Sequence, residues 1–418
     1  MSARWSSTAT DHSADQDNLT LGLLEVARSS HIEMVKHRPR RGWVLPSREN
    51  VTVSSHLRKV VSGVADFERE NLAWRLPVVV ATSTLALMLI CVWLDHVAYA
   101  IPLGAGALFV PVVGMHAPLP RRILTQLWTL MWIMLGTLAG GLVSSDQVLV
   151  STLGVLLAGV FGFGCGFVGA AGTTARLLGV LTLVVFVVFM GGPDTPLGAL
   201  EVAVVLGLGG LVQVVVITLA RLRSEPLRTW VFVPVESSLI SRLRAGWSTR
   251  NDYLRHGVRL GLAIMAATAL SQALSWPHQF WIPMTVAWVS APDNTGTATR
   301  VAARMLGTLG GIAIVAAVLG WQPVSPYGVA VLAGLGALMT IVFFPVQYGL
   351  AVVGVTVFVA SLLSLLGDPL SATETYRVLE TFIACVVTVA FAFVWRALPV
   401  GDVRRGQPGN DPSLVPPG

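Results

Sequence analysis

The chain has 418 residues, of which 54% are apolar and only 12% are charged, and its mean hydropathy is +0.71. Because a soluble globular protein carries roughly 25% charged residues, this composition excludes an ordinary soluble domain and indicates a polytopic membrane protein. The formal net charge of +6 lies mostly in segments that flank apolar runs, which favours a role in membrane topology over nucleic-acid binding.

The N-terminal residues 1–72 are polar, which predicts a cytoplasmic tail without a cleavable signal peptide. The last part of this tail, HLRKVVSGVADFEREN, carries apolar residues at helical spacing. Two interpretations of this segment stand side by side. It is a helix that lies in the membrane interface, or it is a helix that packs on the cytoplasmic face of the bundle.

Apolar segments then recur between residues 73 and 398. Their continuous runs and lengths predict an all-α polytopic membrane protein with about twelve transmembrane helices, since a hydrocarbon core of about 30 Å needs roughly 20 residues. In the first half we place the spans near 74–95, 98–116, 123–143, 147–170, 176–191 and 197–219. In the second half we place them near 256–276, 279–292, 300–319, 326–343, 347–366 and 376–397.

The two halves resemble each other. A spaced proline pair and a Gly-Thr-Leu motif recur in the same order: Pro102 with Pro111 and Pro283 with Pro292, then GTLAGG at 136–141 and GTLGG at 307–311. Six spans per half predict two parallel repeats related by an axis along the membrane normal. We divide the chain into a tail at 1–72, a first six-helix repeat at 73–219, an Arg-rich cytoplasmic linker at 220–255, a second six-helix repeat at 256–398 and a disordered cytoplasmic tail at 399–418.

Arginine and lysine residues gather in alternate loops. They are frequent before the first span, between Arg221 and Arg259, and in the C-terminal tail, whereas the opposite loops carry aspartates and a single cation, Arg377. By the positive-inside rule, the cation-rich loops face the cytoplasm. Both termini are therefore predicted to be cytoplasmic, in a multi-pass protein whose surroundings are the lipid bilayer.

The stretch from 280 to 311 interrupts the apolar pattern with prolines, an acid and two cations. A short, proline-interrupted span is a sequence sign of a transporter binding site. Asp293, Asn294 or Thr295 can cap the next helix, and the helix N-terminus with nearby arginines favours an anion. A tryptophan and a threonine add an aromatic face and a hydroxyl. The candidate substrate-binding residues are Trp281, Pro283, Thr285, Asp293, Arg300 and Arg304.

Plainer interpretations of these residues stay open. Arg300 and Arg304 also fit loop charges that set topology, and Trp281 also fits an anchor at the outer membrane interface. Gly307 and its neighbours in GTLGG favour close helix packing over ligand contact.

Glu201 and Glu380 each open the last span of their half, and they are the candidates for proton coupling. A carboxylate within a span costs on the order of 2.5–3.5 kcal/mol on insertion scales, which argues for a function. For Glu380 the alternative is a salt bridge with Arg377, three residues earlier.

The sequence offers no convincing motif for catalysis or for cofactor binding. GCGFVG at 164–169 formally matches a dinucleotide-binding pattern, but it lies inside an apolar span with no strand before it, which favours helix packing. The only lysines are Lys36 and Lys59, so the chain has no P-loop. The three cysteines lack metal-ligand spacing. We therefore expect no cofactor, no metal and no enzymatic activity.

The stretches FW-I-P-M-T, P-D-N-T-G-T and R-x-x-x-R-x-x-GTLGG follow one another between 280 and 311. This combination resembles the fusaric acid resistance (FUSC) family, which includes bacterial aromatic-acid exporters and is distantly similar to plant aluminium-activated malate transporters. The resemblance is best over 253–398, where Glu380 and Ala384 in RVLETFIA stand in place of an aspartate and a glycine of the family. The first repeat matches weakly, because AIPLGAGALFVP lacks the Trp and Thr of the motif.

The resemblance implies a bacterial inner-membrane transporter that exports organic, in particular aromatic, carboxylates, with proton coupling as an option. A small organic anion is then the substrate, and a homo-oligomer or an unidentified adaptor protein is a candidate partner. Two other functions stay open: a passive organic-anion channel on the same fold, and a non-transporting membrane scaffold for envelope assembly.

Overall fold

The computed structural model describes residues 53–115, 117–144, 152–192, 195–222, 238–248, 252–321, 324–368 and 370–397. The predicted tails up to residue 52 and from residue 398 on, and the middle of the predicted linker, lie outside the described residues.

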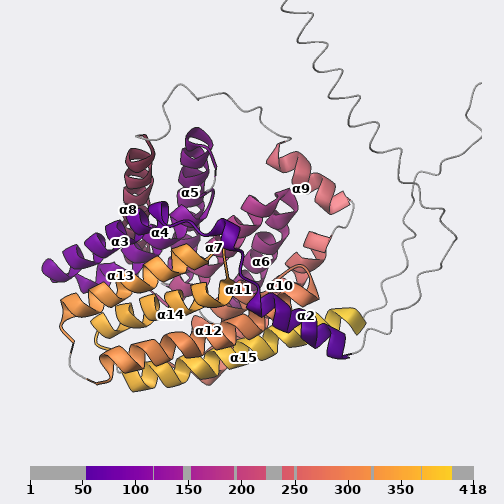
Figure 1. Cartoon of the computed structure of the whole chain (residues 1–418). Coiled ribbons are helices and arrows are strands. Elements are labelled where there is room, and N and C mark those ends of the chain that lie inside the picture. The colour runs from indigo at the N-terminus through magenta and orange to yellow at the C-terminus, as the bar shows by residue number, and fades with distance from the viewer. Residues whose placement is uncertain are drawn as a thin grey trace, which may run out of the picture. The chain divides into compact units, whose positions relative to one another are not determined.

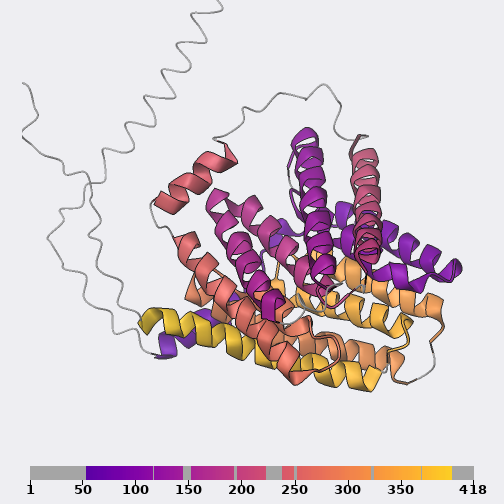
Figure 2. The same cartoon turned by 180° about the vertical axis from the view of Figure 1, so that it is seen from behind.

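The elements assigned in these ranges are all helices (Figures 1 and 2). The first half holds α3 (Arg75–Trp93), α4 (Ala100–Val112), α5 (Leu119–Ser144), α6 (Gly154–Phe167) with η4 (Val168–Ala171), α7 (Thr173–Phe189) and α8 (Pro196–Leu222). The second half holds α10 (Asp252–Leu274), α11 (Trp281–Val289), α12 (Asn294–Leu319), α13 (Pro326–Phe343), α14 (Tyr348–Leu365) and α15 (Leu370–Ala397). From the predicted linker, α9 (Leu239–Ser248) packs on η4.

Each of the twelve predicted spans overlaps one of these helices, although several helices begin or end outside the predicted bounds. Nine are long and apolar enough to cross a membrane, whereas α4, α7 and α11 are shorter. The predicted fold class, an all-α polytopic membrane protein, is confirmed for the described residues. That all twelve helices cross a membrane stays a prediction.

The same helix pairs form in both halves. α4 packs on α8 as α11 packs on α15, and α5 packs on α7 and α8 as α12 packs on α14 and α15. The halves also exchange partners, because α3 packs on α13 while its counterpart α10 packs on α6. Figure 1 shows the pairs α12–α15 and α3–α13 side by side. This recurrence supports the duplication, and we keep 73–219 and 256–398 as its proposed boundaries.

Glycines of the repeated Gly-Thr-Leu motif let neighbouring helices touch. A Cβ added to Gly140 would lie 2.2 Å from the carbonyl oxygen of Phe186 on α7. A Cβ added to Gly307 would lie 2.6 Å from the carbonyl oxygen of Gly349 on α14. Small residues serve this purpose in membrane helices because the backbones can then approach closely. The predicted packing role of Gly307 is therefore confirmed.

The helix α2 (Val53–Ala65) packs against α12. Gly63 lies beside Thr299, and the carbonyl of Val64 accepts a hydrogen bond of 2.8 Å from the side chain of Gln347, at the start of α14. The segment therefore packs on the bundle, and whether it also lies in the membrane interface stays a prediction.

Candidate functional site

A short non-helical segment separates α11 from α12, at the place where the sequence predicts an interrupted span. α11 has nine residues, or about 13 Å at 1.5 Å per residue. Ser290 is already extended, and Pro292 keeps the residue before it out of the helical region. Asp293 then caps α12, because its carboxylate accepts a hydrogen bond of 2.6 Å from the Gly296 amide. Of the three residues that the sequence offers as caps, Asp293 is the one that caps α12.

Arg259 of α10 holds this break in place. Its guanidinium donates to the carbonyls of Ala291 and Pro292 and, at 3.0 Å, to the side-chain oxygen of Asn294. Thr297 closes the turn from the other side, because its hydroxyl bonds the main chain of Ala291. The irregular backbone is therefore satisfied by protein groups, as a break at membrane depth requires.

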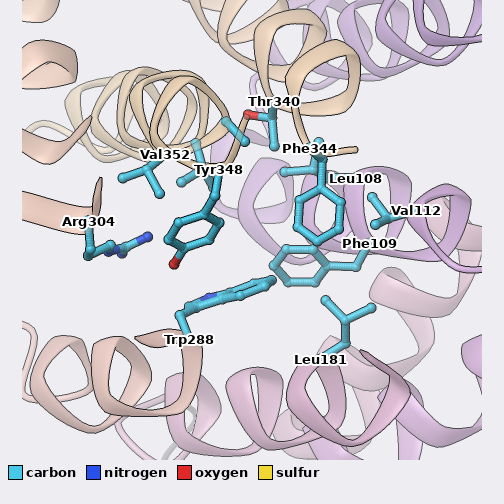
Figure 3. A pocket seen from close by; sticks show the side chains of 12 residues that line it. Leu108, Phe109, Val112, Leu181, Trp288, Arg304, Thr340, Phe344, Tyr348 and Val352 are labelled. Atoms are coloured by element: carbon cyan, nitrogen blue, oxygen red, sulfur yellow. The ribbon is translucent and has the colours of Figure 1, made fainter. Parts of the chain in front are cut away.

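A cavity of about 400 Å³, which includes the part open to solvent, lies where α4, α7, α11, α12, α13 and α14 meet. Four aromatic side chains surround it: Phe109, Trp288, Phe344 and Tyr348 (Figure 3). The Trp288 ring centroid lies 6.3 Å from that of Phe109 and 6.4 Å from that of Phe344. These tilted and edge-on contacts leave an aromatic pocket whose faces come from both halves of the chain.

Arg304 of α12 brings the only charge among the residues that line this pocket. Only 2% of its surface is exposed, and its Nε has no hydrogen-bond partner among the described residues. Figure 3 shows its guanidinium turned toward the Tyr348 hydroxyl, which also has no partner in that part of the chain. Arg300 adds a second cation, 5.8 Å from the centroid of the Tyr348 ring. The pocket therefore has an aromatic interior and unused donors at one end.

A second charged cluster surrounds the other end of α11. The Arg377 guanidinium carbon lies 4.1 Å from the centroid of the Trp281 ring, and Arg377 is only 3% exposed. Glu380 is 1% exposed, and neither of its carboxylate oxygens accepts a hydrogen bond from a described residue. The alternative salt bridge between Glu380 and Arg377 is therefore absent from the described structure.

The structure separates the predicted site residues into groups. Arg304 lines the pocket and Arg300 lies beside it, whereas Pro283 and Thr285 are buried on α11 outside the pocket lining. Trp281 is 1% exposed. An interface anchor would have to reach the lipid, so that alternative for Trp281 is wrong.

The two candidate glutamates differ in their surroundings. Glu201 is exposed near the start of α8, where it accepts a hydrogen bond from the Tyr99 hydroxyl. Glu380 is buried and has no such donor. Of the two, only Glu380 lies in the neighbourhood of α11.

Three aromatic lining residues escaped the sequence interpretation. Phe109 lies on α4 of the first half, and Phe344 and Tyr348 flank the turn between α13 and α14. Phe344 and Tyr348 belong to the aromatic cluster FFPVQY at 343–348, whereas Phe109 stands alone in AIPLGAGALFVP. Nothing in the order of the chain places this cluster next to Trp288.

Residues 265–391 match the family model described as "Fusaric acid resistance protein-like". This segment is fusaric acid resistance protein-like. It includes Trp288, Arg304 and Tyr348 of the pocket and Arg377 and Glu380 of the second cluster. The predicted FUSC resemblance is confirmed, and the distant similarity to plant malate transporters stays a prediction.

Curated relatives match segments of similar length, between 158 and 168 residues. The chain is 31% identical to "Inner membrane protein YccS" of Escherichia coli K12 over 160 residues, 38% of this chain and 22% of the relative. It is 29% identical to "Uncharacterized protein ORF2" of Neisseria gonorrhoeae over 158 residues, 37% of each chain. It is 27% identical to "Uncharacterized protein YhfK" of Escherichia coli K12 over 168 residues, 40% of this chain and 24% of the relative. No solved structure matches.

These matches cover between about a fifth and two fifths of the relatives' lengths. Together with the apolar helices, the FUSC-like segment and the inner-membrane relative support a multi-pass inner-membrane protein.

Proposed function

We propose that the protein exports organic anions, aromatic carboxylates in particular, across the bacterial inner membrane. The observation that carries this proposal is the aromatic pocket whose single lining charge, Arg304, is buried with an unused donor. A buried donor of an ionisable residue that no described protein group satisfies is costly inside a membrane protein, so it argues for a ligand or a transport path.

The pocket matches an aromatic acid in its chemistry. Phe109, Trp288 and Phe344 offer ring faces and edges for a substrate ring. Arg304 and the Tyr348 hydroxyl offer donors for the carboxylate, and hydrogen bonds between charged groups are the strong ones.

The positive-inside rule indicates the side of the membrane from which the pocket loads. With both termini in the cytoplasm, the turn between α11 and α12 lies on the cytoplasmic side, so the pocket next to it loads from the cell interior. Glu380 is buried in the second charged cluster, near the start of α11, away from the turn between α11 and α12. We assign proton exchange to this residue.

Efflux from proteoliposomes tests the proposal. We expect labelled 4-hydroxybenzoate to leave vesicles that contain the protein, and Arg304→Gln to weaken its apparent affinity about 10- to 100-fold, because a hydrogen bond to a charged group contributes about 1.5–3 kcal/mol. The matched control is Arg121→Gln, an exposed arginine of α5, which should leave efflux unchanged. Absence of flux for a panel of organic anions would overturn the transport proposal in favour of a scaffold.

A pH gradient separates an exporter from a passive channel. Glu380→Gln should abolish accumulation driven by a pH gradient but leave downhill flux, because the amide keeps the shape of the side chain and cannot exchange a proton at neutral pH. Glu201→Gln is the matched control, since Glu201 is exposed. If wild-type flux ignores the pH gradient from the start, the protein is a channel and Glu380 does not couple protons.

A further inference from the structure

Three buried threonines on α11, α12 and α15 have free hydroxyls. A threonine within a helix commonly bonds the carbonyl four residues before it. Thr182, for example, donates to Leu178 at 2.8 Å. In contrast, the hydroxyls of Thr285, Thr308 and Thr381 have no hydrogen-bond partner in the described structure, although each residue is at most 1% exposed.

These threonines follow the residues of the two charged clusters at the same spacing. Thr308 comes four residues after Arg304 on α12, Thr285 four after Trp281 on α11, and Thr381 four after Arg377 on α15. Residues four apart share one face of a helix. The helices α11, α12 and α15 all contact one another, Arg377 of α15 lies over Trp281 of α11, and Cys385, four residues after Thr381, lies 4.0 Å from the Val301 carbonyl of α12. We call the three threonine-bearing faces the polar seam.

The seam contains unused donors and two cations. The Trp281 indole nitrogen and the Arg377 Nη1 are buried without a partner among the described residues. Arg304 lies on α12 and Arg377 on α15, and these two helices contact each other. Glu380 does not bond Arg377, because neither of its carboxylate oxygens has a hydrogen-bond partner among the described residues. The unpaired donors of Arg304, Arg377 and Trp281 favour a bound anion, since an unpaired buried polar group costs free energy.

We propose that Arg377, Trp281 and the threonines Thr285, Thr308 and Thr381 form a second anion site, which receives the carboxylate after it leaves Arg304. This inference rests on the proposed function and deepens it. The Trp281 ring lies against the Arg377 guanidinium and stabilises the cation through its π face. The guanidinium edge stays available for the anion. The transport path then runs along α11 from the aromatic pocket to Trp281.

Cysteine accessibility tests this site without changing any charge. In a variant whose three cysteines (Cys91, Cys165 and Cys385) are replaced by alanine and whose efflux is verified, we would introduce Thr285→Cys or Thr308→Cys. The probes are an anionic methanethiosulfonate that carries a sulfonate and a cationic one of similar size that carries a trimethylammonium group. The control is Thr129→Cys in α5, where the hydroxyl donates to Thr125 at 2.8 Å and the residue is equally buried.

We expect the anionic reagent to modify both seam cysteines at least about tenfold faster than the cysteine at 129, and 4-hydroxybenzoate to slow it. Arg377→Gln should reduce the preference for the anionic over the cationic reagent about tenfold or more, because a charge several ångströms away acts through an effective dielectric of about 20. Arg377→Lys should keep this preference, because it keeps the charge.

Two results overturn the second site: seam cysteines that react no faster than the control, or a reagent preference that Arg377→Gln leaves unchanged. The comparison of seam cysteines with the control does not use Arg377→Gln, so it tests the site even if that variant fails to fold. Efflux in the same cysteine-free protein separates this inference from the proposed function. Efflux with unreactive seam cysteines refutes the second site alone, whereas charge-selective modification without efflux of any acid refutes the export proposal alone.

Discussion

Arg259 lines no part of the pocket, yet its removal should disturb the site. Its guanidinium bonds the main chain at Ala291 and Pro292 and the side chain of Asn294. Arg259→Gln breaks this set of bonds, and each hydrogen bond from a charged donor contributes about 1.5–3 kcal/mol. Relief of the buried charge offsets part of this loss. We expect the free energy of unfolding to fall by about 2–4 kcal/mol.

The same change should weaken transport. Trp288 lies next to the last residue of α11, before the turn, and Arg304 lies on α12, which begins after it, so a loosened turn displaces both from the pocket. The measurements are denaturant unfolding in detergent and the concentration dependence of 4-hydroxybenzoate efflux. The matched control is Arg255→Gln, an exposed arginine on the same helix.

The reasoning would be refuted by a specific pair of results. If Arg259→Gln unfolds at the same denaturant concentration as Arg255→Gln, and if both export with the same half-saturation, Arg259 does not hold the break. A stability loss without a change in half-saturation would show that the turn does not position the pocket.

Two further predictions concern packing and recognition. Gly140→Ala should destabilise the fold by about 1–3 kcal/mol because its Cβ meets a carbonyl oxygen, whereas Gly164→Ala, with open space around it, should be neutral or stabilising in denaturant unfolding. Trp288→Leu should weaken competition by benzoate against labelled 4-hydroxybenzoate more than competition by cyclohexanecarboxylate, because ring contacts add about 0.5–1.5 kcal/mol beyond burial. Exposed Trp128 provides the control Trp128→Leu, and equal losses for both acids would argue against ring recognition.

Local properties of the sequence predicted much of the fold. Hydropathy predicts one helix at each of the twelve expected segments, with bounds that differ by several residues, because a helix is the structure that satisfies its own backbone in lipid. The interruption near Pro292 and the cap at Asp293 were also predictable, since proline and aspartate act on their immediate neighbours. The packing glycines follow from the same kind of local reasoning, because only a residue without Cβ allows such contact.

The site itself required the tertiary structure. The sequence predicted that Arg304 favours an anion, but the aromatic residues Phe109, Phe344 and Tyr348 come from helices distant in the chain. Hydropathy measures how apolar a segment is and carries no information about which face of one helix meets another. For the same reason, two glutamates at matching positions in the sequence have opposite surroundings. Glu201 is exposed at the start of α8, and Glu380 is enclosed by the helices packed around α15.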